Sequence, residues 1–404
     1  MDTASSDSTA PRAFTGRFLF LILFARTVLN TAVRAVYPFL PFIATDLNVS
    51  FQSAASIIQA RDLIGITAPL FGPLSDRYGR RAIMLGGMGI TTVASLALLF
   101  ISPLAAIVVA MALVSFGVIL FVPAQQAFLG DRVPYAQRGR IIAAAELAWS
   151  FAAIIGLPLV GIIIRNAGWR WAFAAIGVLG IVALVLLGVM LPRDARAQHK
   201  HTARLHGALL DALRQPIALA AISTSFLLAM ANENLGVIYG EWMKNSYALD
   251  PVALGFVGAA IGGAEFAAEM FAVLFLDRIG KWRTVAGAGL CGAGAYFLFP
   301  LMGANVLLAT AGLVIVFFTF ELAIISVIPL ISEISPHARG TLLSMSIAST
   351  SVGRAVGSFS GPVLLTGFSF GTASIVSGVI CLLAFLTWMF LVREKHGEQS
   401  AAQP

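Results

Sequence analysis

Long apolar runs separated by short polar stretches dominate the chain from end to end. Runs of this kind match a bilayer core of about 30 Å, which a helix of roughly 20 apolar residues crosses. Lipid offers no hydrogen-bond partner to the backbone, so we expect each run to be a helix. The pattern predicts twelve spans, at 17–42, 50–72, 82–101, 104–129, 141–165, 169–191, 216–242, 251–276, 284–303, 305–332, 340–366 and 370–392.

The composition supports a membrane protein. Of the 404 residues, 59% are hydrophobic and 11% are charged, which is too apolar for a soluble protein that must cover its surface with polar groups. We therefore expect an all-α protein embedded in a lipid bilayer.

The basic residues indicate orientation and not a nucleic-acid partner. With both termini placed in the cytoplasm, 19 of the 26 Lys and Arg flank the spans on the cytoplasmic side, three lie on the other side and four lie within spans. This asymmetry is the positive-inside rule, so the net charge of +7 follows from topology.

A long polar stretch divides the spans into two sets of six. The sequence predicts a six-helix bundle at 17–192, a cytoplasmic loop at 193–215 and a second bundle at 216–392, with cytoplasmic tails at 1–16 and 393–404. The first apolar run is too long for a cleaved signal peptide and is expected to be the first span.

The two halves carry an internal repeat. Asp76 and Gly79 correspond to Asp277 and Gly280 at an offset of 201 residues. Two further anchors share this offset without gaps, Arg138-Gly139 with Arg339-Gly340 and Gly177-Val178 with Gly378-Val379. A repeat of six spans predicts two bundles related by an axis along the membrane normal.

The stretch GPLSDRYGRR places four charges in ten residues between the second and third spans. Gly72 and Gly79 allow close backbone approach or a positive φ. Asp76 can accept backbone N–H groups, and the arginines Arg77 and Arg80 can bind carbonyl groups and lipid phosphates while they fix topology.

This stretch resembles the loop 2–3 signature of the major facilitator superfamily of secondary transporters. The twelve spans, the central loop and the repeat extend the resemblance over the chain, and bacterial drug:proton antiporters are the members most similar in look. The resemblance implies two bundles that rock about a central cavity. It also implies that Asp76 latches the cytoplasmic side against the start of span eleven near Gly340, with Arg80 in support. Asp131, at the end of span four, is a candidate third member of this charge cluster.

Ten charged residues fall inside predicted spans. Each costs about 2.5–3.5 kcal/mol at the centre of a membrane helix, so most must face the bundle interior or a wet cavity. Interhelical ion pairs are one explanation and a transport site is the other. The residues are Arg26, Arg34, Arg61, Arg354, Asp62, Glu146, Glu233, Glu265, Glu269 and Glu321.

The first span carries a polar stripe formed by Arg26, Asn30, Arg34 and Tyr37. At about 100° per residue these side chains stay within roughly 80° of one another. Glu233 in span seven lies at nearly the depth of Arg34, so we expect the two to face each other across the central cavity. Burial favours a protonated carboxyl group and a nearby arginine favours an ionised one, a competition that suits loading of either a proton or a substrate.

Three other positions add acidic groups. In span two Asp62 shares a face with Gln59, whereas Arg61 points elsewhere. In span eight Glu265 and Glu269 are four residues apart, so one of them is expected to be protonated or paired with an arginine.

Three intramembrane charges remain. Glu321 stands alone midway through span ten. Arg354 in span eleven either neutralises one of the acids of spans eight and ten or binds substrate. Glu146, near the cytoplasmic end of span five, is expected to be structural.

Glycines in span eleven follow G-x3-G-x3-G-P, a pattern that lets helices approach closely. Proton antiporters of the superfamily show a comparable pattern in span five, where this chain has only a degenerate form between Gly156 and Gly161. Those antiporters also carry an arginine in span four, at the position where this chain has Leu113.

The leading interpretation is a proton-coupled transporter that exports small amphipathic compounds, cationic or neutral, across the bacterial cytoplasmic membrane as a monomer. The expected partners are a small-molecule substrate, protons and the lipid bilayer. An anion carrier of the same superfamily, which transports an anionic metabolite or lipid and uses Arg26 and Arg34 to bind it, is the first alternative, and a non-transporting membrane sensor is the second. All five histidines lie outside the predicted spans, and no enzymatic, metal or cofactor motif is visible.

Overall fold

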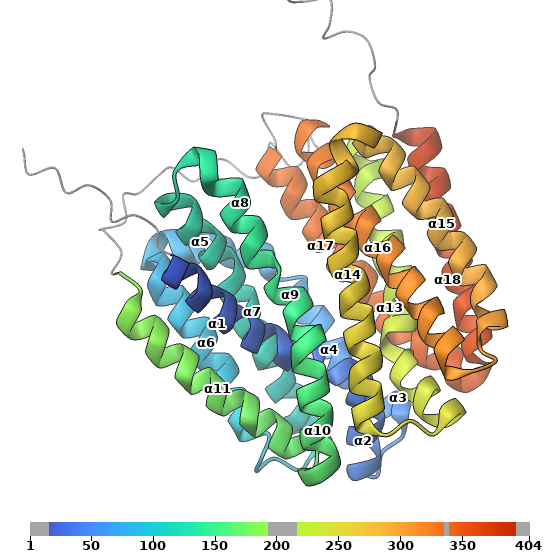
Figure 1. Cartoon of the computed structure of the whole chain (residues 1–404), viewed down its shortest axis with the longest axis horizontal. Coiled ribbons are helices and arrows are strands. Elements are labelled where there is room, and N and C mark those ends of the chain that lie inside the picture. The colour runs from blue at the N-terminus through green and yellow to red at the C-terminus, as the bar shows by residue number, and fades with distance from the viewer. Residues whose placement is uncertain (1–15, 193–215, 335–338, 393–404) are drawn as a thin grey trace, which may run out of the picture.

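The computed structural model describes residues 16–192, 216–334 and 339–392. All regular elements in these ranges are helical and form two bundles side by side (Figure 1). By length and apolarity, nine helices of the described part qualify as membrane spans. The remaining three predicted spans are helical as well: 50–72 is divided among short helices, 82–101 falls largely in an 18-residue helix, and 340–366 lies in a 29-residue helix. The number twelve stays a prediction.

The N-terminal half holds short and long helices in chain order. They are α1 Gly16–Arg34, α2 Val36–Asp46, α3 Phe51–Ala54, α4 Ser56–Gly65, α5 Ala68–Tyr78, α6 Arg80–Ala97, α7 Leu104–Arg132, α8 Tyr135–Glu146, α9 Ala148–Phe151, the π-helical turn η1 Ala152–Gly156, α10 Leu157–Ala167 and α11 Trp169–Met190.

In the C-terminal half, the described residues form six unbroken helices. They are α13 Pro216–Tyr247, α14 Pro251–Ile279, α15 Lys281–Met302, α16 Val306–Ile334, α17 Arg339–Gly367 and α18 Phe370–Leu391. Among them, α13 runs as a single helix past Gly236.

Prolines explain two interruptions in the N-terminal half. Pro38 has no N–H to donate to the carbonyl of Arg34, and the first span breaks between α1 and α2 at Ala35. Pro158 similarly lacks a donor for Ile154, which lies in η1, and a π-turn accommodates the missing bond. Both interruptions lie beside the space between the halves.

The halves meet most closely at one end, here called the closed end, where α2 contacts α13 and α10 contacts α14. Glycines allow this approach: a Cβ on Gly240 would lie 2.8 Å from the carbonyl oxygen of Tyr37, and one on Gly255 would lie 2.8 Å from that of Leu157. In Figure 1 the bundles converge at this lower end and diverge toward the upper end, where α5 ends and α8 begins. This upper end is called the open end below.

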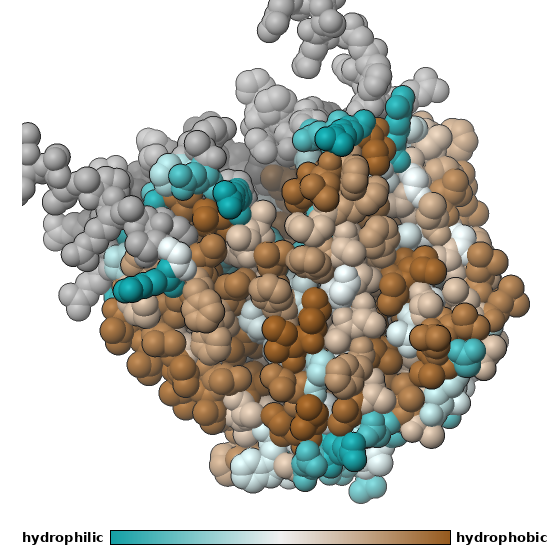
Figure 2. All heavy atoms as spheres, in the orientation of Figure 1, coloured by the Kyte–Doolittle hydropathy of each residue, from teal (hydrophilic) through white to brown (hydrophobic). Residues whose placement is uncertain are grey.

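The outer surface suits a lipid environment. Figure 2 shows a broad apolar belt on the visible face, with polar residues gathered at the upper and lower edges. Large apolar side chains are exposed around both halves, including Phe20, Val189, Leu301 and Phe390. Together with the apolar helices, the belt identifies a multi-pass integral membrane protein.

In the C-terminal half, α13 and α17 pack along a glycine seam. The glycines of the span-eleven pattern each face a backbone carbonyl of α13, in the order Gly353 on Phe226, Gly357 on Met230 and Gly361 on Asn234. The four-residue period on both helices keeps their backbones in contact over two turns. This seam fixes the face of α17 that borders the space between the halves.

Candidate functional site: a charged, aromatic cavity between the halves

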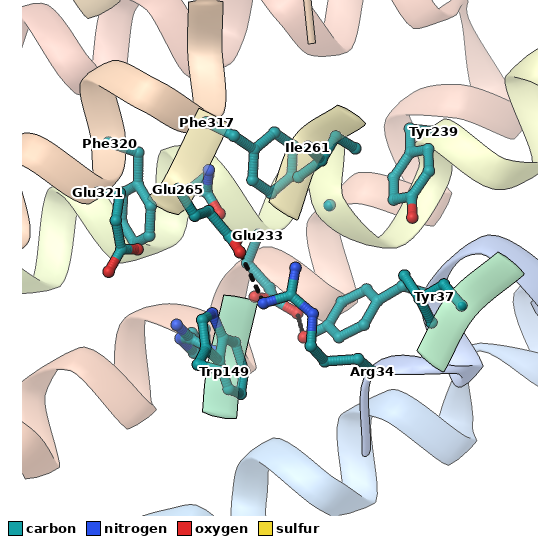
Figure 3. Close-up of a pocket in the computed structure, with 14 residues that line it drawn as sticks. Arg34, Tyr37, Trp149, Glu233, Tyr239, Ile261, Glu265, Phe317, Phe320 and Glu321 are labelled. Carbon is teal, nitrogen blue, oxygen red and sulfur yellow. Dashed lines mark hydrogen bonds and ion pairs between the residues drawn. The ribbon is translucent and has the colours of Figure 1, made fainter. Parts of the chain in front are cut away.

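A cavity lies between the two halves and encloses about 510 Å³, counting the part open to solvent. Figure 3 shows charged and aromatic side chains from both halves directed into it. The lining residues are Arg34, Tyr37, Trp149, Leu157, Asn232, Glu233, Gly236, Tyr239, Ile261, Glu265, Phe317, Phe320, Glu321 and Arg354.

Arg34 joins the halves through an ion pair with Glu265. Its Nη1 lies 2.7 Å from a carboxylate oxygen of Glu265, and both side chains are buried (Figure 3). The guanidinium also lies 4.4 Å from the ring centroid of Trp149 on α9. Arg34 is therefore held by a carboxylate on one side and an aromatic face on the other.

Glu233 does not contact Arg34, the partner predicted from its depth in the membrane. The Tyr37 hydroxyl donates a 2.6 Å hydrogen bond to it, and Arg61 Nη2 lies 3.5 Å from the same carboxylate oxygen. The expected pair of Glu233 with Arg34 is thus wrong. Both residues line the cavity, but Arg34 contacts Glu265.

Arg61 is the centre of this second cluster. Its Nε donates to Asp62 at 3.0 Å, its Nη2 donates to the Tyr37 hydroxyl, and its guanidinium lies 4.5 Å from the Tyr37 ring centroid. Asp62 is 4% exposed, so Arg61 supplies the charge that this buried carboxylate needs. The cluster extends from α2 and α4 to α13 and so crosses between the halves.

Two cavity charges remain uncommitted. Glu321 on α16 and Arg354 on α17 both line the cavity and are half-buried. Within the described part of the chain neither forms an ion pair or a hydrogen bond. Arg354 therefore does not neutralise Glu265, Glu269 or Glu321 by direct contact.

Aromatic rings complete the cavity wall. They come from both halves and are Tyr37, Trp149, Tyr239, Phe317 and Phe320. Tyr239 and Phe317 meet edge to face with centroids 6.4 Å apart. Such a wall suits an apolar or cationic organic group. Among the described residues no group of three His, Cys, Asp or Glu is placed to hold a metal ion.

Four of the expected site residues lie away from the cavity. Arg26 pairs with Glu146, with Nη1 2.7 Å from a carboxylate oxygen, in agreement with the structural role expected of Glu146. Asn30 is buried in α1, Asp62 is held by Arg61, and Glu269 is half-buried one turn beyond Glu265. None of the four lines the cavity.

Sequence reasoning missed the aromatic wall and the central role of Arg61. Most rings stand in spans that are largely apolar, where composition does not separate a cavity ring from a lipid-facing one. Phe317 did carry a signal, because it lies one turn before Glu321 on the same face of its helix. Arg61 did carry a signal. An arginine midway through a span requires a partner, and the nearest acid was its neighbour Asp62.

The GPLSDRYGRR stretch forms a charge cluster at the open end. Arg80 pairs with Asp76, its Nε lies 3.3 Å from Asp131, and its Nη1 donates to Ser75 at 2.7 Å. The turn is made by Gly79 at φ 95°, and its repeat counterpart Gly280 adopts φ 93°.

The remaining members of the stretch lie beside this cluster. Gly72 lies within α5, and Arg77 stacks 5.3 Å from the Tyr78 ring centroid. Asp76 is exposed and contacts its own half. The side chains at the start of α17, including the position of Gly340, lie outside the described residues.

Solved structures with the same fold are known. The chain superimposes on a D-xylose-proton symporter with a TM-score of 0.78 and 17% identity, covering 94% of this chain and 98% of that one. It superimposes on the nucleoside transporter NupG with a TM-score of 0.74 and 15% identity, covering 93% and 100%. These likenesses show the fold.

Relatives by sequence are transporters by name. The chain is 27% identical to the uncharacterized MFS-type transporter YwfA of Bacillus subtilis, over 91% of this chain and 90% of that one. It is 23% identical to the inner membrane transport protein YdhP of Escherichia coli, over 86% and 90%. Residues 19–231 and 221–404 match the Major Facilitator Superfamily. The chain therefore belongs to the Major Facilitator Superfamily and is a multi-pass secondary transporter.

Proposed function

We propose that this transporter exports small amphipathic compounds, cationic or neutral, in exchange for protons. The observation that carries the proposal is the cavity lining, where three carboxylates and two arginines stand among five aromatic rings. The slight acidic excess favours protons and organic cations, and the rings favour an apolar body. The direction, the bacterial cytoplasmic membrane, the twelve spans with cytoplasmic termini and a monomeric state belong to the same proposal.

Glu233 is the proposed proton site. It is 3% exposed and links α13 to Tyr37 and Arg61 of the other half. A proton on this carboxylate would cancel its attraction to Arg61 and weaken a contact between the halves. Proton binding would in this way bias the equilibrium between the two arrangements of the halves.

The charge cluster at the open end is the proposed conformational latch. Arg80 holds Asp76 and Asp131 within one half while this end is open. Asp76 is then available to meet the start of α17 when the halves close there.

The contacts of the arginines disfavour the anion carrier. That alternative requires Arg26 and Arg34 as ligands for an anionic group. Arg26 pairs with Glu146 and Arg34 with Glu265, so neither guanidinium is available without breaking an ion pair. An anion would have Arg354 as its one uncommitted cation among the described cavity residues.

Inverted vesicles that hold a proton gradient, read with a pH-quenched dye, test the proposal. Lipophilic cations, neutral amphiphiles and organic anions are added to the parent, to Glu233→Gln and to Glu241→Gln. Glu241 is on the same helix and hydrogen-bonds Asn245 at 2.9 Å away from the cavity, so it provides a matched control.

Gradient loss on addition of cations or neutral amphiphiles, retained by Glu241→Gln and abolished by Glu233→Gln, is expected. A response to anions alone would overturn the substrate class. Unchanged proton movement in a folded Glu233→Gln variant would overturn the proton site.

A further inference from the structure

The charges that line the cavity divide into committed and uncommitted groups. Arg34, Glu265 and Glu233 each have a partner of opposite charge within 3.5 Å. Glu321 and Arg354 have none among the described residues. Arg354 is attracted to Glu233 from beyond ion-pair distance. The charge that the cavity offers a ligand for direct contact is therefore bipolar, with one carboxylate and one guanidinium.

The two uncommitted groups belong to neighbouring helices of one half. α16 and α17 contact each other, and α17 is fixed on α13 by Gly353 and Gly357, which flank Arg354 by one and three residues. The guanidinium therefore projects from a firmly packed backbone. Both groups belong to the C-terminal half, so a rigid-body movement of the halves would leave their spacing unchanged.

An apolar surface lies beside the carboxylate. Phe317 is one helical turn before Glu321 on the same face of α16, and Phe320 is its direct neighbour. Both rings line the cavity together with Trp149 from the other half. A ligand held at Glu321 would place its apolar body against these rings.

We infer that the cavity selects zwitterionic compounds with an apolar or aromatic body, in which Glu321 binds the cationic group and Arg354 binds the anionic group. The inference rests on the proposed function, whose neutral substrates it narrows to molecules with two opposite charges. A ligand with one charge would leave the second cavity charge without a partner when water is displaced, and such a penalty is what creates specificity.

Three probes that share a phenylethyl body separate the contributions of the cationic and the anionic group to binding. They are phenylalanine, with both charges, 2-phenylethylamine, with the cation alone, and 3-phenylpropionate, with the anion alone. Their binding to the purified full-length protein in detergent is measured by isothermal titration calorimetry without a proton gradient. The variants are Glu321→Gln, Arg354→Gln, and Glu241→Gln as a control.

The expected result is a reciprocal change of preference. The parent and Glu241→Gln bind phenylalanine about tenfold or more tightly than either single-charge probe, the effect of one charge-assisted contact. Glu321→Gln prefers 3-phenylpropionate to 2-phenylethylamine, and Arg354→Gln has the opposite preference. A purely structural role would weaken all three probes together and leave their order unchanged.

Two results would overturn the inference. One is a parent that binds 2-phenylethylamine as tightly as phenylalanine, with no change of order in Arg354→Gln. The other is the absence of binding by these probes and by the matching indole series of tryptophan, tryptamine and 3-indolepropionate. If Arg354→Gln fails to fold, Arg354→Lys serves in its place, and it must keep the parent's order while it weakens the anionic probe.

The vesicle assay separates this inference from the proposed function. Reciprocal probe preferences in the two variants without proton movement in vesicles would contradict proton coupling and leave the zwitterion site standing. Proton movement driven by cations, without reciprocal probe preferences in the two variants, would contradict the zwitterion site and leave proton coupling standing.

Discussion

The two halves handle their intramembrane charges differently. The N-terminal half contains ion pairs of its own, Arg26 with Glu146 and Arg61 with Asp62. Within the described part of the C-terminal half, the intramembrane residues form no ion pair with one another. Its helices α13 and α17 are joined by a glycine seam instead.

This difference locates the functional charges. Arginines of the N-terminal half reach across to Glu233 and Glu265, while Glu321 and Arg354 are left for the cavity. A half that is stabilised by backbone contact can present charges without depending on them for packing. The same residue types therefore serve as internal supports in one half and as site groups in the other.

The largest expected effect comes from breaking the Arg61 cluster. Arg61→Gln leaves Asp62 buried without a cation, and removal of one partner from a buried pair typically costs about 3–5 kcal/mol. Thermal unfolding of the detergent-solubilised protein should show a large drop in Tm. The double variant Arg61→Gln/Asp62→Asn removes the stranded charge and should recover most of this loss. Equal losses in the single and double variants would contradict a supporting role for the pair.

The glycine seam should show the next largest effect. A Cβ on Gly357 would lie 2.7 Å from the Met230 carbonyl oxygen and 2.8 Å from the Glu233 Cβ, so Gly357→Ala must separate α17 from α13. Overpacking of this kind costs about 1–3 kcal/mol. Gly367→Ala, on the same helix with open space around its Cβ, is the control. Equal Tm values for the two variants would show that the seam does not support the C-terminal half.

The positions of the helices and of the two matching turns could be predicted from the sequence, because they depend on local composition. The apolar runs predicted the helices, and the offset of 201 residues predicted matching turns, which Gly79 and Gly280 form with nearly equal φ angles. The breaks at Ala35 and in η1 could not be placed, since a proline shows where a hydrogen bond is lost and not how the chain adapts.

Charge pairing could not be predicted for a different reason. Depth in the membrane placed Glu233 level with Arg34, but the break at Ala35 redirects the chain between Arg34 and Tyr37, and each meets a different acid. Arg61 and Asp62 leave α4 about 100° apart, yet the long arginine side chain returns to its neighbour at 3.0 Å. Helix rotation and side-chain reach are properties of the packed structure.

A smaller loss of stability is expected when the ion pair of Arg26 with Glu146, which lies outside the cavity, is removed. Arg26→Gln should cost on the order of 1 kcal/mol, because Glu146 is 38% exposed and water can solvate it. Tm should fall slightly, and the order of preference among the three phenylethyl probes should stay that of the parent. A change in that order would place Arg26 in the ligand site and weaken the distinction between supporting and functional charges.

The smallest effect should come from Trp149, which supports Arg34 without neutralising it. The ring lies 4.4 Å from the guanidinium, and a cation–π contact contributes about 0.5–1 kcal/mol where water has access. Trp149→Leu should therefore lower Tm slightly, and Trp149→Phe, which keeps an aromatic face, should lower it less.

Double-mutant cycles with Arg34→Gln isolate each contact of Arg34. The coupling of Arg34 to Glu265, an ion pair at 2.7 Å between buried side chains, should exceed its coupling to Trp149. The reverse order would mean that Arg34 is held mainly by its contact with Trp149 in the N-terminal half. The ion pair with Glu265 would then contribute little, and the proposed difference between the charges of the two halves would fail.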